Sequence, residues 1–394
     1  MKYNNIFAKR TEKMGASVIR EILKVVNQPG VISLAGGIPA PESFPMDVIK
    51  KLCQKVLEKY GGNALQYDLS EGFTPLRKAL IDYLAPKGIK ASLTQITISC
   101  GSQGVLDNMG KIMIDKDDKI AVESPTYLGA LQAFNPYEPQ YISMQTDEDG
   151  LIPESLEQTL KNHRIKFIYL VPNFQNPTGR TITLSRRKKI SQLIKKYDAL
   201  LLEDDPYGEL RYEGKLLPSI KSLAPQNVVY TSTLSKLFAP GLRIGFSVAP
   251  EPISNWLVLT KQGVDLHTST FNQALAAEYI SLGFMAKQIK KNIKLYQPRQ
   301  KAMLSALEKY FPPGFRWSHP EGGMFIWVEG PKGFDAEKTY WQVVKNKVAY
   351  VPGKYFFANP NEGCNTMRLN FSMADEKTIT KAIKILADVL KKEA

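Results

Sequence analysis

The chain is poor in cysteine and has no long apolar run, and each shortage excludes a class of protein. Its 394 residues include three cysteines, Cys53, Cys100 and Cys364, an odd number spread far apart. This spacing excludes a disulfide framework and a C-x-x-C metal site, and it favours a reducing compartment. The N-terminus lacks the apolar core of a signal peptide, and no apolar run approaches the ~18 residues of a membrane span. We therefore expect a cytoplasmic protein with no metal site and no membrane partner.

The composition is that of an ordinary globular protein, with 43% hydrophobic and 23% charged residues and no internal repeat or low-complexity tract. The formal net charge of +14 is carried by basic residues that are mixed with acids through the expected helices. Short clusters such as residues 186–189 are typical of a solvated helix face, so we expect no nucleic-acid partner. The positive field would instead attract small anionic substrates.

Short apolar runs alternate with helical stretches through the middle of the chain, which predicts a mostly parallel sheet with helices on both faces. The expected strands are residues 96–100, 119–122, 166–171, 199–204, 227–232 and 244–249. After about Lys287 the pattern changes to a long helix, short strands and a closing amphipathic helix, which predicts a smaller α+β domain. Pro298 should kink the long helix or mark a boundary.

The stretch Y-T-S-T-L-S-K-L-F-A-P-G-L-R-I-G, residues 230–245, follows one of these runs and suits an anionic cofactor linked to a lysine. Thr233, Ser235 and Arg243 can donate hydrogen bonds to a phosphate, and Lys236 can form a Schiff base with an aldehyde. For Lys236 alone, a solvated basic residue is the simpler interpretation. The other strand ends decide between the two, because ligands bind beyond the carboxyl ends of parallel strands.

Two strand ends offer groups for a phosphate and an aromatic ring. Ser102 and Gln103 follow a glycine turn and open a helix, whose free N–H groups favour a phosphate. Tyr127 ends another run, where its ring could stack on a heteroaromatic one. An ordinary helix start and an ordinary loop tyrosine explain these fragments equally well.

Three further polar side chains are expected at positions where a buried group would need a hydrogen-bond partner or an opposite charge. Asn176 lies in N-F-Q-N-P-T-G, where it could donate to a phenolate oxygen or simply serve the turn. Asp204 ends an apolar strand three residues before Tyr207, and it suits a protonated pyridine nitrogen unless E-D-D is a plain acidic loop. Arg368 lies on a strand expected in the small domain, where its planar fork matches a carboxylate. A solvent-facing arginine on an edge strand is the alternative.

The ordered motifs G-S-Q-G, S-P-T-Y, N-F-Q-N-P-T-G, E-D-D-P-Y, S-K-L-F-A-P-G-L-R-I-G and M-R-L-N-F-S closely resemble those of the fold-type I aminotransferases that depend on pyridoxal 5'-phosphate. The resemblance covers nearly the whole chain and is strongest to the branch with 2-aminoadipate and kynurenine aminotransferases. It implies an aspartate-aminotransferase-like α/β fold with a seven-stranded, mostly parallel sheet. The expected parts are an N-terminal arm (1–44), a large cofactor-binding domain (45–290) and a small C-terminal domain (291–394).

The resemblance also implies a role for each candidate residue. Lys236 would hold the cofactor and move a proton at the substrate Cα, and Asp204 would pair with the pyridine nitrogen. The ring oxygen would contact Asn176 and Tyr207, and the ring would stack on Tyr127. The implied phosphate ligands are Ser102, Gln103, Thr233, Ser235 and Arg243.

Two implied contacts concern the substrate and a second subunit. Arg368 would bind the substrate α-carboxylate, with Asn176 as a further substrate contact, and Gly37 and Ile38 would line the substrate pocket together with Arg20. Tyr67 would reach the phosphate of a partner subunit, which implies a homodimer with shared sites. Arg20 resembles an arginine that binds a distal carboxylate in 2-aminoadipate relatives, although a solvated helix residue is as good an explanation.

The expected activity is therefore amino transfer from 2-aminoadipate, glutamate or a large apolar or aromatic amino acid to 2-oxoglutarate. The resemblance places K-Q-G-V-D-L-H-T-S-T where classical aspartate aminotransferases have a second arginine, contributed by the other subunit. No arginine occurs there, so strict aspartate specificity is not expected. A β-lyase or a decarboxylase could use the same residues. An aminotransferase-like regulator is a weaker alternative, since only about 30 residues precede V-I-S-L-A-G-G, too few for a DNA-binding domain.

Overall fold

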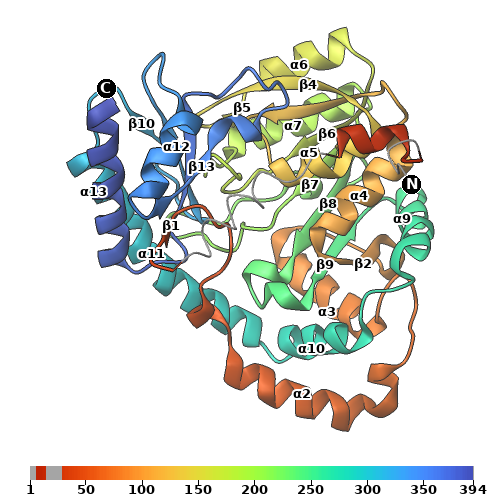
Figure 1. Ribbon diagram of the computed structural model, residues 1–394. Coiled ribbons are helices and arrows are strands. Elements are labelled where there is room, and N and C mark those ends of the chain that lie inside the picture. The colour runs from red at the N-terminus through yellow and green to blue at the C-terminus, as the bar shows by residue number, and fades with distance from the viewer. Residues whose placement is uncertain (1–5, 15–28, 394) are drawn as a thin grey trace.

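A computed structural model describes residues 6–14 and 29–393 of the chain (Figure 1). The first half of the described chain contains the helices α2 Met46–Tyr60, α3 Thr74–Leu84, α4 Gly101–Met113, α5 Leu128–Phe134, α6 Pro153–Asn162 and α7 Leu184–Lys196. The second half contains α8 Ile220–Leu223, α9 Glu251–Asp265, α10 Thr270–Ser281, α11 Phe284–Tyr310, α12 Ala336–Lys345 and α13 Glu376–Glu393. None of the described helices is both long enough and apolar enough to cross a membrane.

The main sheet has the strand order β2-β9-β8-β7-β6-β3-β4-β5. Its strands are β2 Ile96–Cys100, β3 Lys119–Ser124, β4 Gln140–Asp147, β5 Gly150–Leu151, β6 Ile165–Leu170, β7 Leu201–Asp204, β8 Val228–Thr233 and β9 Ile244–Val248. The run from β8 through β7, β6 and β3 to β4 is parallel, whereas β9 is antiparallel to both of its neighbours. The α/β class is confirmed. The sheet has one strand more than the seven expected, because the two-residue β5 pairs with β4 at the edge.

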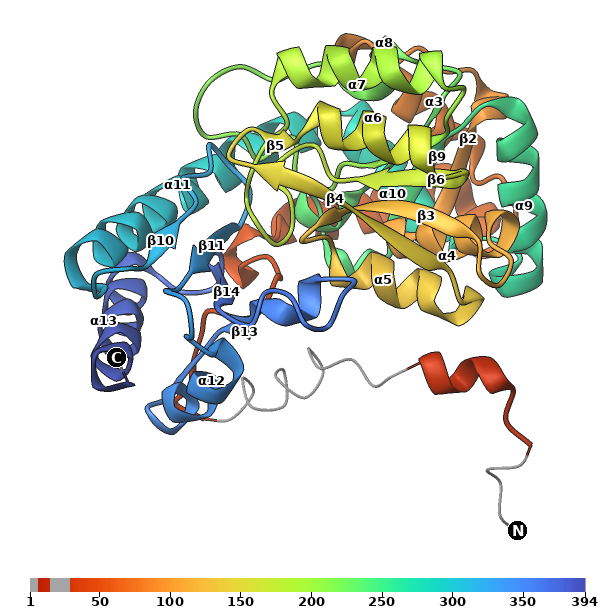
Figure 2. The same cartoon turned by 90° about the horizontal axis from the view of Figure 1, so that it is seen from above.

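Successive residues of the central strands pack against opposite faces of this sheet. Phe167 and Tyr169 of β6 join a cluster with side chains of α4 and α5, whereas Ile168 and Leu170 join a cluster with α6 and α7. Figure 2 shows these helix pairs on either side of the sheet. Strands with two covered faces must be apolar at nearly every position, which explains the unbroken runs in the sequence. A polar side chain at the end of such a strand therefore enters a buried environment.

The C-terminal part has a separate core around a four-stranded sheet of order β10-β11-β14-β13. Its strands are β10 Arg316–Trp317, β11 Phe325–Glu329, β13 Val351–Pro352 and β14 Thr366–Asn370, and a separate pair joins β1 Ile32–Ser33 to β12 Val348–Ala349. Helix α11 continues through Pro298, with Met285 in the core beside α2, α3 and α10 and Met303 in the C-terminal core. The domain boundaries at residues 44 and 290 remain a prediction.

Candidate active site

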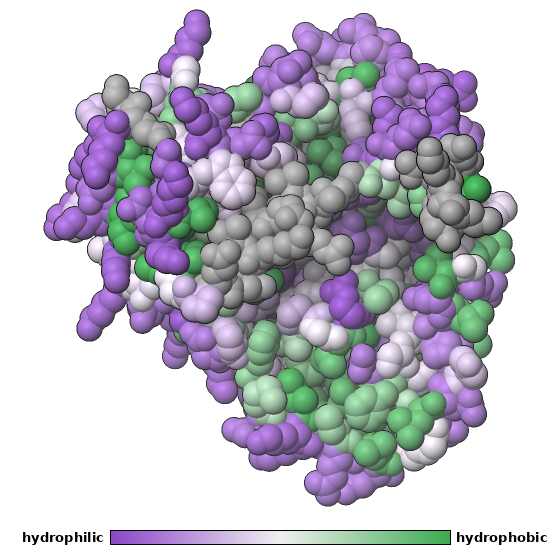
Figure 3. Space-filling view, viewed as in Figure 1, coloured by the Kyte–Doolittle hydropathy of each residue, from purple (hydrophilic) through white to green (hydrophobic). Residues whose placement is uncertain are grey.

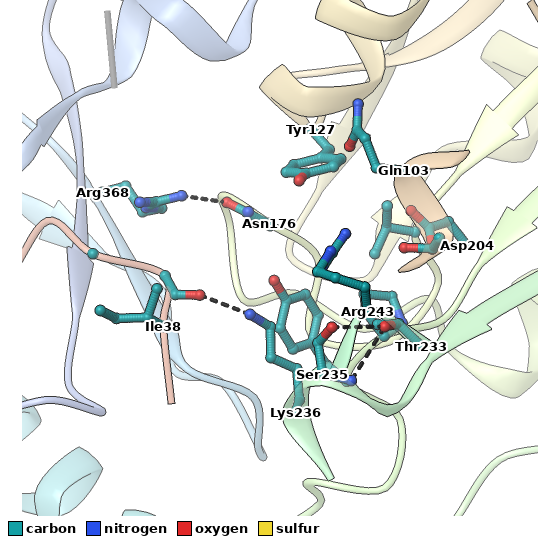
Figure 4. Close-up of a pocket in the computed structure, with 16 residues that line it drawn as sticks. Ile38, Gln103, Tyr127, Asn176, Asp204, Thr233, Ser235, Lys236, Arg243 and Arg368 are labelled. Carbon is teal, nitrogen blue, oxygen red and sulfur yellow. Dashed lines mark hydrogen bonds between the residues drawn. The ribbon is translucent and has the colours of Figure 1, made fainter. Parts of the chain in front are cut away.

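A cavity of about 370 Å³ lies at the carboxyl ends of the central strands, where the C-terminal part meets the main sheet (Figure 4). All the residues singled out in the sequence line it except Tyr67 and Arg20. The lining is Gly36, Gly37, Ile38, Ser102, Gln103, Tyr127, Val171, Asn176, Asp204, Pro206, Tyr207, Thr233, Ser235, Lys236, Arg243 and Arg368. The chain therefore brings to one place groups that lie more than 300 positions apart.

Lys236 is the lysine of this cavity and ends a short 3₁₀ turn, Leu234–Lys236, that directly follows β8. The Thr233 hydroxyl accepts from the Ser235 backbone N–H at 3.1 Å and so fixes the turn. The Lys236 Nζ donates to the Gly37 carbonyl at 2.8 Å (Figure 4). Burial, aided by the nearby charges of Arg368 and Arg243, lowers the pKa of Lys236 to about 8. A larger fraction of this amine is therefore neutral and nucleophilic at physiological pH than for an ordinary lysine.

One end of the cavity is a cradle for an anion, where the start of α4 meets β9. Two glycines allow the contact: Gly101 has a positive φ of 69°, and a Cβ on Gly245 would lie 2.3 Å from the carbonyl carbon of Gly101. Arg243 donates to the Cys100 and Pro240 carbonyls at 3.2 and 3.3 Å. This space is thus lined by helix N–H groups, by Arg243 and by the hydroxyls of Ser102, Thr233 and Ser235. Such a set of hydrogen-bond donors suits a phosphate.

Asp204 ends β7 in the middle of the cavity wall and is almost completely buried. Burial raises the pKa of this carboxyl to about 7, although a hydrogen bond from Tyr169 opposes the shift. The Tyr169 hydroxyl donates to Asp204 Oδ2 at 2.9 Å, whereas the buried Oδ1 has no hydrogen-bond partner among the described residues. A buried carboxylate oxygen without a donor is costly. A protonated ring nitrogen would satisfy it, so the residues present fit a pyridinium ring.

The neighbouring acids Glu203 and Asp205 have different partners, which rules out a plain acidic loop. Glu203 points to the opposite face of the sheet and accepts from the backbone N–H groups of Ile220 and Lys221 at 2.9 and 2.7 Å. Asp205 accepts from Asn173 and from the Gly208 backbone N–H, which holds the loop after β7. Because strand side chains alternate, Asp204 alone of the three faces the cavity.

The other end of the cavity contains Arg368 of β14, with 2% of its surface exposed. Its guanidinium donates to Asn176 Oδ1 at 2.8 Å and to the Ala35 carbonyl at 2.6 Å, and it lies 4.4 and 5.0 Å from the ring centroids of Phe325 and Phe356. No carboxylate among the described residues pairs with it, and its Nε has no partner there. Burial lowers the pKa of Arg368 to about 10. A cation held only by neutral groups is suited to an incoming carboxylate.

The remaining lining residues place aromatic and amide groups between these two ends. Tyr127 immediately precedes α5, and Tyr207 lies edge-on to Phe325 with 5.7 Å between ring centroids. The Gln103 amide donates to the Gly129 carbonyl at 2.7 Å. Figure 4 shows Tyr127 and Gln103 on the same side of the cavity, opposite Lys236. A planar ring would thus find an aromatic face above Asp204.

Two predicted residues are not in this cavity. Tyr67 is 77% exposed and contacts His267 edge-on, with 5.5 Å between ring centroids. Arg20 lies outside the described residues.

Some important residues were not predicted from the sequence. Tyr169 looked like any apolar strand residue, and only the partner of its hydroxyl shows its place in the site. Phe325 begins β11 and Phe356 ends the short 3₁₀ helix Gly353–Phe356, and neither carries a polar group that would mark it in the sequence. Gly245, by contrast, was part of the R-I-G motif, and its close approach to Gly101 explains why a glycine is needed there.

A family model described as aminotransferase class I and II matches residues 29–386. The chain belongs to the class I and II aminotransferases. It is 44% identical to aromatic-amino-acid aminotransferase 1 of Thermococcus litoralis, in an alignment that covers 100% of this chain and 96% of that relative. The family assignment predicted from the motifs is therefore confirmed, and the chain is a transaminase.

Solved structures of related aminotransferases share the fold over the whole chain. The kynurenine aminotransferase of Pyrococcus horikoshii, in complex with PMP, is 44% identical with a TM-score of 0.96, covering 100% of this chain and 98% of that chain. The α-aminoadipate aminotransferase of Thermus thermophilus, complexed with N-(5'-phosphopyridoxyl)-L-leucine, is 37% identical with a TM-score of 0.93, covering 100% and 99%.

Proposed function

We propose that this aminotransferase uses pyridoxal 5'-phosphate, bound through Lys236, to move the amino group of an L-amino acid to 2-oxoglutarate. The observation that carries the proposal is the unpartnered Asp204 Oδ1, which faces the same cavity as the Lys236 amine and the phosphate cradle. The phosphopyridoxyl and PMP complexes of the two related enzymes support it. When bound, the cofactor supplies an aldehyde that links to amines and a ring that draws electrons.

Each residue then has a task that follows from its position. Lys236, with its lowered pKa, would take up the proton from the substrate Cα and hold it for return. Arg368 binds the α-carboxylate and fixes the direction of the Cα–H bond, a contribution of positioning. Asn176 holds the guanidinium in place through its Oδ1, and its own amide can donate to the ring oxygen. Asp204 would pair with the ring nitrogen, and its burial keeps water away from the carboxylate.

The proposed donors are large apolar or aromatic amino acids, 2-aminoadipate and glutamate. Ile38, Val171 and Tyr127 give the cavity an apolar wall. Among the described lining residues, Arg243 and Arg368 are the only arginines, and they belong to the phosphate and α-carboxylate ends. A second substrate carboxylate therefore needs another cation, and Arg20 is the proposed one. The relatives named for aromatic amino acids and α-aminoadipate support both donor classes.

We also propose a cytoplasmic homodimer with shared sites. Three large side chains that follow α2 are exposed, Leu65 at 72%, Tyr67 at 77% and Leu69 at 54%, and Figure 3 shows apolar side chains gathered over the region of α2 and α10. Clusters of this kind mark protein interfaces. Arg243 is also exposed, so a second subunit would close the phosphate end. The three cysteines are free thiols, which agrees with a reducing compartment.

The test follows the visible absorbance of the purified protein loaded with pyridoxal phosphate. Adding phenylalanine or 2-aminoadipate should bleach the yellow band, and 2-oxoglutarate should restore it. Product analysis separates the alternative reactions, since a β-lyase releases pyruvate and ammonia and a decarboxylase releases carbon dioxide. No yellow band in the wild type at saturating cofactor would overturn the cofactor proposal. A band unaffected by any amino acid would overturn the donor proposal alone.

A further inference from the structure

Tyr169 is a buried phenol that the proposed roles above leave unused. It lies on β6 beside β7, with Leu202 as its register partner, and its ring packs edge-on against Phe134 at 5.9 Å within the cluster below α4 and α5. Its surface is 0% exposed. A phenol in such apolar surroundings needs a hydrogen-bond partner, and its partner is the Asp204 carboxylate at 2.9 Å.

The two oxygens of that carboxylate are not equivalent. Oδ2 accepts from Tyr169, while Oδ1 is fully buried and has no partner among the described residues. Asp204 receives no other side-chain or backbone hydrogen bond to its carboxylate within the described part of the chain. A single donor therefore sets the rotation of the group about its side-chain bond, and with it the direction of Oδ1.

We propose that Tyr169 is a positioning residue, which holds the Asp204 carboxylate through Oδ2 so that Oδ1 meets the ring nitrogen of the cofactor. The inference rests on the proposed function, because it needs a cofactor with that nitrogen. The hydrogen bond also withdraws electron density from the carboxylate, so the shared proton stays on the ring nitrogen and not on Asp204. Burial and the Asp204 charge raise the pKa of Tyr169, so the phenol remains a donor at physiological pH.

The test compares two ligands and three proteins, the wild type and two variants, by equilibrium binding to the apoprotein. The ligands are pyridoxal phosphate and its 1-deaza analogue, in which carbon replaces the ring nitrogen. The variant is Tyr169→Phe, which keeps every ring contact and removes one hydroxyl. Tyr141→Phe is the matched control, because it removes a half-buried hydroxyl on β4 that donates to Asn135 Oδ1 at 2.6 Å, away from the site.

The expected result is a loss of binding affinity that occurs only when the ligand has the ring nitrogen. Tyr169→Phe should weaken pyridoxal phosphate binding about tenfold, since a hydrogen bond to a charged group is removed. The deaza analogue should bind Tyr169→Phe within about twofold of wild type, because the Tyr169 bond is then present before and after binding and its loss cancels. The ¹⁵N chemical shift of the ring nitrogen should move toward the deprotonated form in Tyr169→Phe and stay unchanged in Tyr141→Phe.

Two outcomes would overturn the inference. An equal loss for both ligands would show that Tyr169 only supports the fold, and no loss for either would show that Asp204 needs no orientation. If Tyr169→Phe does not fold, p-fluorophenylalanine at position 169 fills the space of the hydroxyl without donating and is expected to give the same pattern. A wild-type protein that binds neither ligand would instead contradict the proposed function, so the two failures are distinguishable.

Discussion

The cofactor end and the substrate end of the cavity are built in different ways. The groups of the cofactor end, such as Asp204, Thr233 and Lys236, follow neighbouring strands of one sheet and are fixed by that sheet. The substrate end joins Gly37, Asn176 and Arg368, which come from the N-terminal segment, the loop after β6 and β14. The first end is therefore set by one element of the fold, whereas the second depends on how the C-terminal part packs against the sheet.

The two ends also hold their cations differently. Arg243 is exposed and satisfied by two backbone carbonyls, whereas Arg368 is buried between two aromatic rings. In both cases no carboxylate among the described residues neutralises the guanidinium. Substitutions at the cofactor end should therefore change cofactor binding, and substitutions at the substrate end should change substrate affinity.

The largest effect is expected for Lys236→Ala at the cofactor end. Without the amine neither the covalent link nor the proton transfer is available, so the transamination rate should fall by at least about 10⁴-fold. Steady-state assays at saturating cofactor measure this loss. The matched control is Lys261→Met, which removes another buried lysine, one paired with Asp265 at 2.7 Å outside the cavity, and should keep near-wild-type activity. Residual activity within tenfold of wild type would contradict the role of Lys236.

Exchanging arginine for lysine at each end tests the division directly. Arg368→Lys should raise the KM for amino acids about 100-fold, because lysine cannot offer a planar fork to the α-carboxylate. Cofactor affinity should change little. Arg243→Lys should have the reverse pattern, with weaker cofactor binding and a nearly unchanged KM once the cofactor is saturating. Steady-state kinetics measures the KM and cofactor titration measures the cofactor affinity. Similar patterns in both variants would contradict the division into a cofactor end and a substrate end.

Neighbouring acids on opposite faces of β7 should differ in how much stability they gain on neutralisation, because Glu203 accepts two backbone hydrogen bonds and Asp204 Oδ1 accepts none. Burial raises the Asp204 pKa from 3.8 to about 7, so its charge destabilises the apoprotein above pH 7 and the cost vanishes as the pH falls toward 4. Asp204→Asn should therefore stabilise the apoprotein by up to about 4 kcal/mol at pH 8, at about 1.4 kcal/mol for each pKa unit. The gain should disappear near pH 4.

Urea unfolding of the apoprotein across that pH range checks this expectation. Glu203→Gln is the matched variant. Burial raises the pKa of Glu203 to about 7 as well, but glutamine has only one acceptor oxygen for the two backbone N–H groups of Ile220 and Lys221, so its gain at pH 8 should be clearly smaller than that of Asp204→Asn. A loss of stability in Asp204→Asn at pH 8 would mean that a hidden donor satisfies Oδ1.

The sequence predicted the residues of the cofactor end more completely than the surroundings of Arg368 at the substrate end. The residues of the cofactor end lie in short motifs that directly follow apolar runs. Lys236, Asp204 and Arg243 could therefore be found by their spacing from those runs. Local patterns also predicted the sheet, apart from β4 and β5, whose mixed polar residues hide the strand period at the sheet edge. Tyr169 and the aromatic pair around Arg368 were missed because apolar side chains look alike until packing shows their neighbours.

Tyr67→Phe is expected to have the smallest effect and tests whether the cofactor end is complete within one subunit. In a homodimer the Tyr67 hydroxyl of one subunit would donate to the phosphate held by the other, so its loss should weaken cofactor binding about three- to tenfold. Tyr310→Phe, a tyrosine at the end of α11, should leave binding unchanged. Dilution below the dimer dissociation constant should make wild type and Tyr67→Phe bind equally weakly, because the donor then leaves with the partner. Equal binding by the two proteins as dimers would instead show that each phosphate cradle needs only its own chain.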